Sequence, residues 1–521
     1  MKSLNASATA AARRGAARVA IAAVAMLAAA PAMAQTVKVE GGTLRGAKAG
    51  DLEIYKGIPY AAPPTGDRRW RAPAPVVKWP GIRDAAAFGA DCVHTRADWE
   101  ADRNGAPMSE DCLFLNVWAP ATRIKAGAPV MLWIHGGSFT GGSGSQALYD
   151  GAALAARGLV VVTINYRLGR FGFFAHPALT AEAGRGPTGN WGFMDQVAAL
   201  KWVRANIRAF GGDPAKVTIF GESAGGRSVN TLMAMPAARG LFARAIAQSG
   251  GGGRDETTSL ATAESKGRAY AVAAGVTGDD LAALRAIPAD KLLANLASWG
   301  GDSPTYSGPM IDGKLVREST DVAFRGGRQA AVPYLAGANS YEIGFFPAPL
   351  RKTFTAMLGA QLGAALPGIK SAYGSSDAFE RNLGGDVLFV EPSRYLAGLA
   401  APRPSYLYLF DYLPEGLRAK QSGVPHGGEI PFVFGTLNML GVPASDADRA
   451  MAKLVGDYWT DFARGGNPNG GGRADWPGYS RTTGARILFS TSGAAVGSAA
   501  SPALDSLATF QDAKRDTSLR K

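Results

Sequence analysis

A serine between two glycines is the residue of this chain with the clearest chemical potential. Ser223 is the centre of the pentapeptide GESAG, directly after the apolar run at residues 217–220 and at the start of a helix-like stretch at residues 225–235. Glycines at such a junction allow a sharp turn that exposes the serine hydroxyl. The sequence therefore predicts a nucleophilic serine. In a chain with 68 glycines the pentapeptide alone is a weak signal, so possible partners decide its meaning.

The first partner that Ser223 needs is a base. A serine hydroxyl requires a base that takes its proton and an acid that orients this base. Serines at strand-to-helix turns are typical of the α/β-hydrolase fold, in which the chain order is serine, acid, histidine. Of the four histidines only His426 follows Ser223, in a loop rich in glycine and proline. We therefore expect His426 to be the base.

The acid is expected between Ser223 and His426. Residues 332–336 read as a strand, and Glu342 follows shortly after them. This places Glu342 at the carboxyl end of a strand, where open α/β sheets present their functional groups. From the residues alone, Glu342 could also be a surface side chain, with Asp411 or Asp321 as the acid.

A turn of small residues supplies a third element. The strand-like residues 129–134 lead into His135-Gly136-Gly137-Ser138. Backbone N–H groups of such a turn, together with that of Ala224, can stabilise the oxyanion of a tetrahedral intermediate. Each donor of this kind is typically worth about 3 kcal/mol of barrier. Seen alone, the same residues could form an ordinary turn.

The elements that must position these residues alternate between strand and helix. Residues 129–134 and 160–165 are continuous apolar runs, which is typical of central strands covered on both faces. Residues 195–210 carry apolar side chains three to four positions apart, which predicts a helix. The pattern predicts an α/β fold with a large, mostly parallel central sheet and helices on both faces. Residues 491–501, rich in Gly, Ser and Ala, read as a surface loop.

The first 34 residues read as a signal peptide. Four basic residues and no acids precede an apolar run at residues 19–30, and the small-residue site AMA ends at Ala34. The alternative, a membrane anchor, is disfavoured because the run is shorter than the ~20 residues of a spanning helix. We expect cleavage before Gln35, a single domain over residues 35–521, and an exported protein, periplasmic or secreted, without a membrane span.

Charge and cysteine content limit the other function classes. The formal net charge is +13, but Lys and Arg are scattered, which favours a solvated basic surface over a nucleic-acid interface. In an exported protein the single pair Cys92 and Cys112 indicates a disulfide, with two reduced buried thiols as the alternative. Two cysteines and four histidines argue against a metal site, and we expect no cofactor.

Taken together, these features resemble the type-B carboxylesterases of the cholinesterase family. The resemblance runs from about residue 37 to residue 479 and rests on several stretches in the right order. These are GIPYA at 57–61, SEDCLFLNV at 109–117, NYRLG at 165–169, GNWG at 189–192, FGGDP at 210–214 and WTDFA at 459–463.

The resemblance implies a catalytic triad of Ser223, His426 and Glu342 that hydrolyses esters through an acyl-enzyme. It also implies a disulfide between Cys92 and Cys112. The supporting residues that it implies are Gly137, Ser138 and Ala224 as oxyanion donors, Gly136 as a shaper of their turn, Glu222 as a buried electrostatic modulator, and Ser249 in the surroundings of His426.

Three positions depart from the family pattern. Tyr341 and Ile343 flank Glu342 where the family usually has Asp and Gly, and Ser138 replaces a Gly or Ala, which should be harmless to a backbone donor. Arg227 lies in the first turn of the expected helix, where relatives usually carry a small or apolar residue. Since a cation there opposes the helix dipole, we expect an acidic neighbour near the site.

The substrate is predicted only as a class. Phe139, Trp191, Phe193 and Phe345, with Phe346, could line an apolar pocket, although such aromatics are more often core residues. The loop between the two cysteines, where lipases of the family carry a lid, holds Arg96, Asp98, Glu100, Asp102 and Arg103. We therefore expect a soluble esterase for small to medium apolar or aromatic esters, monomeric or homodimeric, in preference to a lipase. An amidase or carbamate hydrolase, and a non-catalytic binding domain, are the alternatives.

Overall fold

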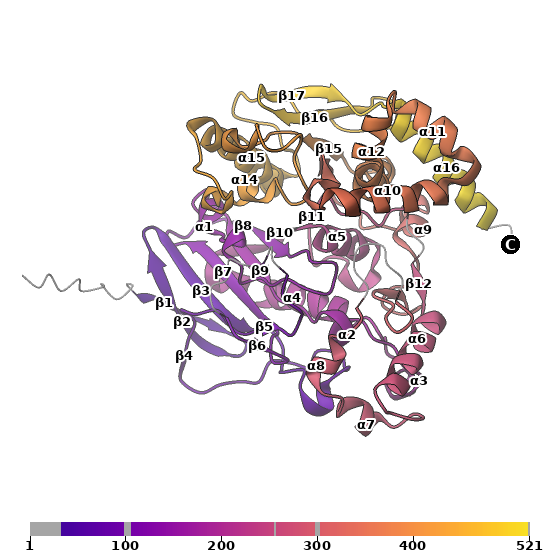
Figure 1. Ribbon diagram of the computed structural model, residues 1–521. Helices are drawn as coiled ribbons and strands as arrows, with labels where there is room; N and C mark the ends of the chain where they lie inside the picture. Colours follow the sequence, from indigo (N-terminus) through magenta and orange to yellow (C-terminus); the bar gives the residue numbers. More distant parts are fainter. Residues whose placement is uncertain (1–32, 98–99, 101–105, 255–256, 297–302, 519–521) are drawn as a thin grey trace, which may run out of the picture.

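A large, mostly parallel sheet forms the centre of the molecule (Figure 1). The computed structural model describes residues 33–97, 100, 106–254, 257–296 and 303–518. Within these residues the main sheet has 13 strands. Their order is β1 (Met33–Val39), β2 (Gly42–Ala49), β3 (Leu52–Pro59), β7 (Phe114–Pro120), β9 (Val160–Ile164), β8 (Ala128–Ile134), β10 (Gly212–Glu222), β11 (Arg244–Gln248), β14 (Tyr334–Asn339), β15 (Ser405–Phe410), β16 (Ala485–Ser490) and β17 (Gly493–Ser498), with β4 (Ile82–Asp84) paired to β2.

In the middle of the sheet, the neighbouring strands β9, β8, β10, β11, β14, β15 and β16 run parallel to one another. At the two ends of the sheet, β1, β2, β3, β7 and β17 pair antiparallel. The predicted mostly parallel sheet is therefore confirmed. Two small two-stranded sheets lie outside it, formed by β5 (Asp91–Cys92) with β6 (Met108–Ser109) and by β12 (Thr258–Ser259) with β13 (Met310–Ile311).

Helices cover both faces of the sheet (Figure 1). The predicted helix at residues 195–210 is found as α4 with a following 3₁₀ turn, and the stretch after Ser223 is α5. The helices are α1 (Ala152–Ala155), α2 (Gly169–Gly172), α3 (Pro177–Ala183), α4 (Trp191–Asn206), α5 (Ala224–Ala234), α6 (Leu260–Ala273), α7 (Leu281–Arg285), α8 (Ala289–Leu292), α9 (Thr320–Arg325), α10 (Ala348–Leu362), α11 (Leu366–Ala372), α12 (Ser376–Gly385), α13 (Glu391–Leu399), α14 (Ile430–Phe434), α15 (Asp446–Gly465) and α16 (Pro502–Ser518).

The apolar runs form strands because both of their faces are buried. In β8, Val130 and Leu132 belong to the core cluster that includes Val229 of α5, and Met131 and Trp133 belong to the cluster on the other face. All four strand residues have no solvent exposure. A central strand of this kind is apolar throughout instead of alternating with polar residues.

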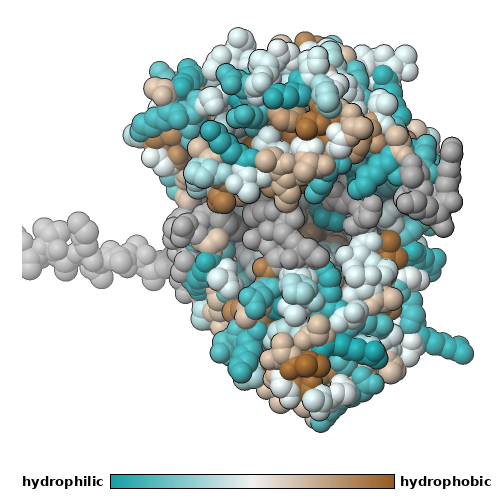
Figure 2. All heavy atoms as spheres, turned by 45° about the vertical axis from the view of Figure 1, so that its right-hand side comes forward, coloured by the Kyte–Doolittle hydropathy of each residue, from teal (hydrophilic) through white to brown (hydrophobic). Residues whose placement is uncertain are grey.

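The residues at 491–501 are not a loop, contrary to the prediction. Six of them form β17, which pairs antiparallel with β16 at the edge of the sheet. On the face drawn in Figure 2, apolar side chains form separate small patches among polar ones. Within the described ranges, no helix is both long and apolar enough to cross a lipid bilayer.

The sheet brings the segments with the candidate catalytic residues together at the carboxyl ends of its parallel strands. The parallel neighbours β8, β10, β11 and β14 end at Ile134, Glu222, Gln248 and Asn339. Since parallel strands share the edge at which they end, the segments that follow them converge there.

Candidate active site

Ser223 occupies a tight turn between β10 and α5. Its backbone angles are φ +57° and ψ −123°, a conformation rarely adopted by residues other than glycine. The flanking glycines are required by close packing, because a Cβ at Gly225 would lie 1.9 Å from the carbonyl oxygen of Ile134, and one at Gly221 would lie 2.6 Å from the same atom. The strained turn thus places a serine at the edge of the sheet, as the sequence predicts.

Glu342 is held by three hydrogen bonds. Its Oε1 accepts from the backbone N–H of Asn339 and from the hydroxyl of Ser249, each at 2.6 Å. Its Oε2 lies 2.6 Å from Nδ1 of His426. The carboxylate is 1% exposed, so it is oriented by these groups instead of by water. Such a carboxylate fixes the orientation of the imidazole.

His426 lies in the loop between β15 and α14. Its backbone N–H donates to the carbonyl oxygen of Glu342 at 3.2 Å, and its Nε2 is 3.0 Å from Oε1 of Glu222. Its ring stacks on Phe389 with centroids 4.5 Å apart, and Phe345 lies 6.0 Å away. The structure therefore brings the imidazole between two carboxyl groups, and Glu222 directly precedes Ser223.

Burial and charge shift the pKa values of this pair. Burial raises the pKa of Glu222 to about 8, against the opposing field of His426. Burial alone would lower the pKa of His426, but the Coulombic fields of Glu222 and Glu342 outweigh it and raise this pKa to about 9. The two neighbouring groups therefore hold a proton more strongly than isolated side chains do.

The turn after β8 runs beside Ser223. Gly137, Ser138 and Phe139 all have positive φ, at 102°, 55° and 61°. A Cβ at Gly136 would lie 3.1 Å from Cβ of Ser223, and one at Gly137 would lie 2.2 Å from the carbonyl oxygen of Gly141. The small residues thus let this backbone approach the serine closely, as an oxyanion-binding turn requires.

Most of the aromatic residues expected at the pocket are core residues. Phe139, Trp191 and Phe193 are at most 4% exposed and belong to the largest core cluster. Phe345 is different, since it is 42% exposed and lies near His426. Burial of the first three fits core packing better than contact with a substrate.

A disulfide joins Cys92 and Cys112. Inside the loop that it closes, the buried carboxylate of Glu100 lies 2.6 Å from Nε2 of His94. We expected this loop to be charged, unlike the lid of a lipase. Three of the charged residues behind that expectation, Asp98, Asp102 and Arg103, lie outside the described residues.

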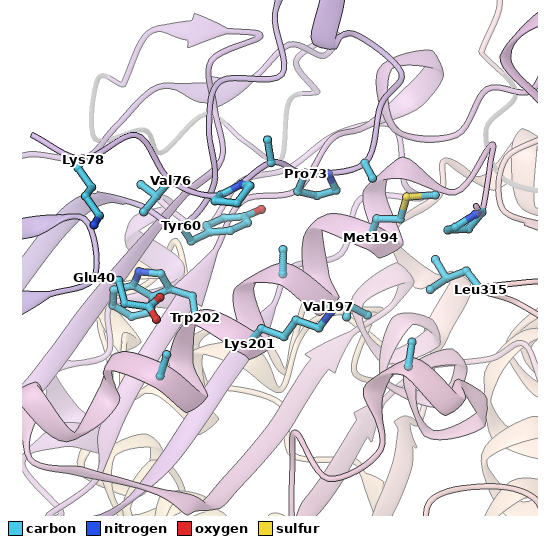
Figure 3. Close-up of a pocket in the computed structure, with 17 residues that line it drawn as sticks. Glu40, Tyr60, Pro73, Val76, Lys78, Met194, Val197, Lys201, Trp202 and Leu315 are labelled. Carbon is cyan, nitrogen blue, oxygen red and sulfur yellow. The ribbon is translucent and has the colours of Figure 1, made fainter. Parts of the chain in front are cut away.

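A groove of about 970 Å³ lies apart from this site, and its lining includes none of the three triad candidates (Figure 3). Trp202 of α4 and Tyr60 contribute to its apolar wall, and Lys78 and Lys201 also line it. In the part of the chain that the structure describes, no group of three His, Cys, Asp or Glu side chains is arranged to hold a metal ion.

Several residues of the site have no motif in the sequence. Asn339 donates its backbone N–H to Glu342 and its side-chain amide to Glu429 at 2.6 Å, and Gln248 donates to the same Glu429 at 2.9 Å. Phe389, which stacks on His426, belongs to a π-helical segment at Asp386–Val390. The one available signal was position, because Gln248 and Asn339 end strands at the edge where the site lies.

Comparison with known proteins gives a consistent result. The model described as "Carboxylesterase family" matches residues 33–358 and 370–500. The chain is 38% identical to fumonisin B1 esterase of Sphingopyxis macrogoltabida, covering 88% of this chain and 86% of the relative. It is 37% identical to para-nitrobenzyl esterase of Bacillus subtilis (strain 168), covering 86% of this chain and 93% of the relative.

Solved structures agree with these relatives. A thermophilic PNB esterase structure is 34% identical, with a TM-score of 0.80, covering 89% of this chain and 97% of that one. A second PNB esterase structure, also 34% identical over the same shares of both chains, gives a TM-score of 0.78. The chain therefore belongs to the carboxylesterase family of α/β-hydrolases and is a carboxylic ester hydrolase.

Proposed function

We propose that Ser223, His426 and Glu342 form the triad that carries out ester hydrolysis. The observation that carries this assignment is the 2.6 Å contact between Nδ1 of His426 and the buried carboxylate of Glu342, beside the strained turn of Ser223. Neutral His426 takes the proton of Ser223 as the oxygen attacks the ester carbonyl. Glu342 orients the imidazole and stabilises its protonated form.

The turn after β8 supplies the oxyanion site. The backbone N–H groups of Gly137, Ser138 and Ala224 stabilise the tetrahedral oxyanion, and Gly136 leaves room for this approach. His426 then gives its proton to the leaving alcohol, and an acyl-enzyme remains on Ser223. Water repeats the sequence, releases the acid and restores the serine.

Small to medium apolar or aromatic esters fit this site best. The support is the pair of aromatic rings next to His426, one stacked on it (Phe389) and one partly exposed (Phe345). By likeness to the para-nitrobenzyl esterase of Bacillus subtilis, p-nitrobenzyl esters belong among the substrates.

The same proposal extends to the precursor. Residues 1–34 are removed as a signal peptide, and residues 35–521 form one domain of an exported enzyme, acting as a monomer or homodimer. The disulfide between Cys92 and Cys112 supports an oxidising compartment, because disulfides persist mainly outside the cytosol.

Covalent labelling tests the triad. A fluorophosphonate should add the mass of one phosphonyl group to the mature protein, and peptide mapping should place this adduct on Ser223. Ser223→Ala should lose both the labelling and the hydrolysis of p-nitrophenyl acetate. Ser393→Ala is the control, because the hydroxyl of this buried serine donates to a backbone carbonyl oxygen, that of Gly337, instead of to a triad candidate. An adduct on another residue, or labelling of Ser223→Ala, would refute the assignment.

A further inference from the structure

The groove of about 970 Å³ lies along one face of α4 (Figure 3). The residues of this helix that line it recur at intervals of three and four, which is the spacing of a single helix face. They are Met194, Val197, Ala198, Lys201, Trp202 and Ala205. With a rise of about 1.5 Å per residue, this face is about 16 Å long. The groove therefore suits an extended small molecule better than a compact one.

The walls of the groove are largely apolar. Trp202 and Tyr60, which line it, are only 4% and 5% exposed. Residues 72–76, Ala-Pro-Ala-Pro-Val, supply a second wall. Pro73 and Pro75 have no backbone N–H, so this wall offers few hydrogen-bond donors. An apolar chain fits between the two walls without leaving polar groups of the backbone unpaired.

The polar groups left for a ligand are donors. In the described part of the chain, the ammonium groups of Lys78 and Lys201 make no ion pair or hydrogen bond. The indole N–H of Trp202 has no hydrogen-bond partner there either, and a buried donor of this kind normally has one. Two cations and an indole N–H together favour a ligand that accepts hydrogen bonds and carries negative charge.

The carboxylate among the lining residues, Glu40, is engaged within the fold. Its backbone N–H donates to Oδ1 of Asn206 at 2.8 Å, and its Oε2 lies 3.5 Å from Nδ2 of the same side chain. Both contacts tie Glu40 to the end of α4. Two lysines thus face one carboxylate, and the lysines leave an excess of positive charge in the groove.

Polar and apolar groups are separated along the groove. Figure 3 shows Lys78 and Trp202 at one end, Lys201 in the middle, and Met194 and Leu315 at the other end. A molecule that lies along α4 therefore meets cations with one end and apolar side chains with the other.

We propose that this groove binds carboxylates that carry an extended apolar chain, at a site separate from the one that hydrolyses esters. The ammonium groups donate to the carboxylate, and the chain is removed from water along the apolar walls. Carboxylic acids are products of ester hydrolysis, so such molecules arise wherever the enzyme acts. Binding in the groove does not depend on Ser223, which is not among the lining residues.

The test compares two amphiphiles of opposite charge. Decanoate is the probe, and decyltrimethylammonium carries the same alkyl chain with a positive head group. The mature protein is first treated with a fluorophosphonate, which blocks the proposed active site. By isothermal titration calorimetry we expect a Kd of about 0.1–1 mM for decanoate, as is usual for so small a ligand. The cation should bind at least about 10-fold more weakly, because the lysines repel it.

Variants of the lining residues separate the charge from the groove itself. Lys78→Met with Lys201→Met should weaken decanoate binding about 10-fold, because hydrogen bonds to a charged group are lost. Ala198→Phe should weaken it as well, because the added ring fills the groove. Lys453→Met on α15 is the matched control, since this lysine is 75% exposed, pairs with Asp457 and does not line the groove. It should keep the wild-type Kd.

A photoreactive decanoate analogue with a diazirine locates the site without any variant. Its adducts should map to residues 72–78 or 194–205. Adducts only elsewhere, no heat of binding with decanoate, or equal binding of the cation would overturn the proposal. So would an equal loss of affinity in Lys453→Met, or a loss of decanoate binding when the serine is blocked. Failure of the fluorophosphonate to label Ser223 would bear on the triad alone.

Discussion

Among the charged neighbours of His426, Glu222 exerts the largest Coulombic effect on the pKa of the imidazole. Its carboxyl group lies 3.0 Å from Nε2 of His426 and is buried. When ionised, it favours the protonated imidazole, which in the proposed mechanism is the form that could not accept the proton of Ser223. The raised pKa of Glu222 limits this effect, since a protonated carboxyl group exerts no net charge.

Glu222→Gln should extend activity to lower pH. The amide removes a negative field that raises the pKa of His426, so this pKa should fall by about 1 unit or more. Since the base must be neutral, the acid limb of kcat/KM should move down by the same amount in a profile measured from pH 5 to pH 10. Glu415→Gln, at an exposed position, should leave the limb in place. An unmoved limb in Glu222→Gln would show that this carboxyl group does not act on the imidazole.

At the scale of elements, the contact of α5 with β8 sets the position of Ser223. Gly225→Ala should lower the free energy of unfolding by about 1–3 kcal/mol, because the added methyl group would overlap the carbonyl oxygen of Ile134. Urea denaturation followed by tryptophan fluorescence measures this change. Gly368→Ala in α11 is the matched control, since no atom lies within 4 Å of the added Cβ.

The Gly368→Ala variant should be neutral or slightly more stable, because alanine favours a helix more than glycine does. Equal stability of the two alanine variants would mean that α5 can shift away from β8 without cost.

The sequence predicts elements well where burial dictates the residue types. The apolar runs that became β8 and β9 had to be apolar on both faces, and this requirement is visible in the chain. The prediction of a surface loop at residues 491–501 was wrong. A strand of Gly, Ala and Ser at a sheet edge, such as β17, has no apolar pattern and forms by pairing with β16.

The positions of the candidate site residues could be predicted only as far as they follow strand ends. Ser223 and Glu342 follow β10 and β14, and the fold order then selects His426. Phe389 was missed, since its stacking on His426 depends on how a distant π-helical segment packs. Asn339 was missed because its backbone N–H, which any residue except proline would supply, makes the contact with Glu342.

At the scale of the whole molecule, Arg254 links three distant segments. Its side chain is 4% exposed and pairs with Glu391 of α13 and Asp512 of α16, two helices that contact each other. Glu391→Gln leaves a buried cation poorly compensated, so we expect a loss of about 3 kcal/mol of unfolding free energy.

Asp505→Asn provides the comparison for Glu391→Gln. This aspartate of α16 pairs with Arg394 but is 63% exposed, and exposed pairs contribute about 0–1 kcal/mol. Thermal melts of both variants should therefore differ clearly. Similar melting temperatures would show that Asp512 alone is enough to compensate Arg254.

The proposed cleavage of the precursor would have a chemical consequence in the first strand, β1. The backbone nitrogen of Gln35 lies 3.3 Å from Oε1 of Glu53, a buried carboxylate that also pairs with Arg123 at 2.5 Å. Cleavage after Ala34 would turn that nitrogen from a neutral amide into an ammonium group. Maturation would thus create a new positive charge beside an existing carboxylate. The ion pair between the new ammonium group and Glu53 would hold the mature amino terminus at the edge of the sheet.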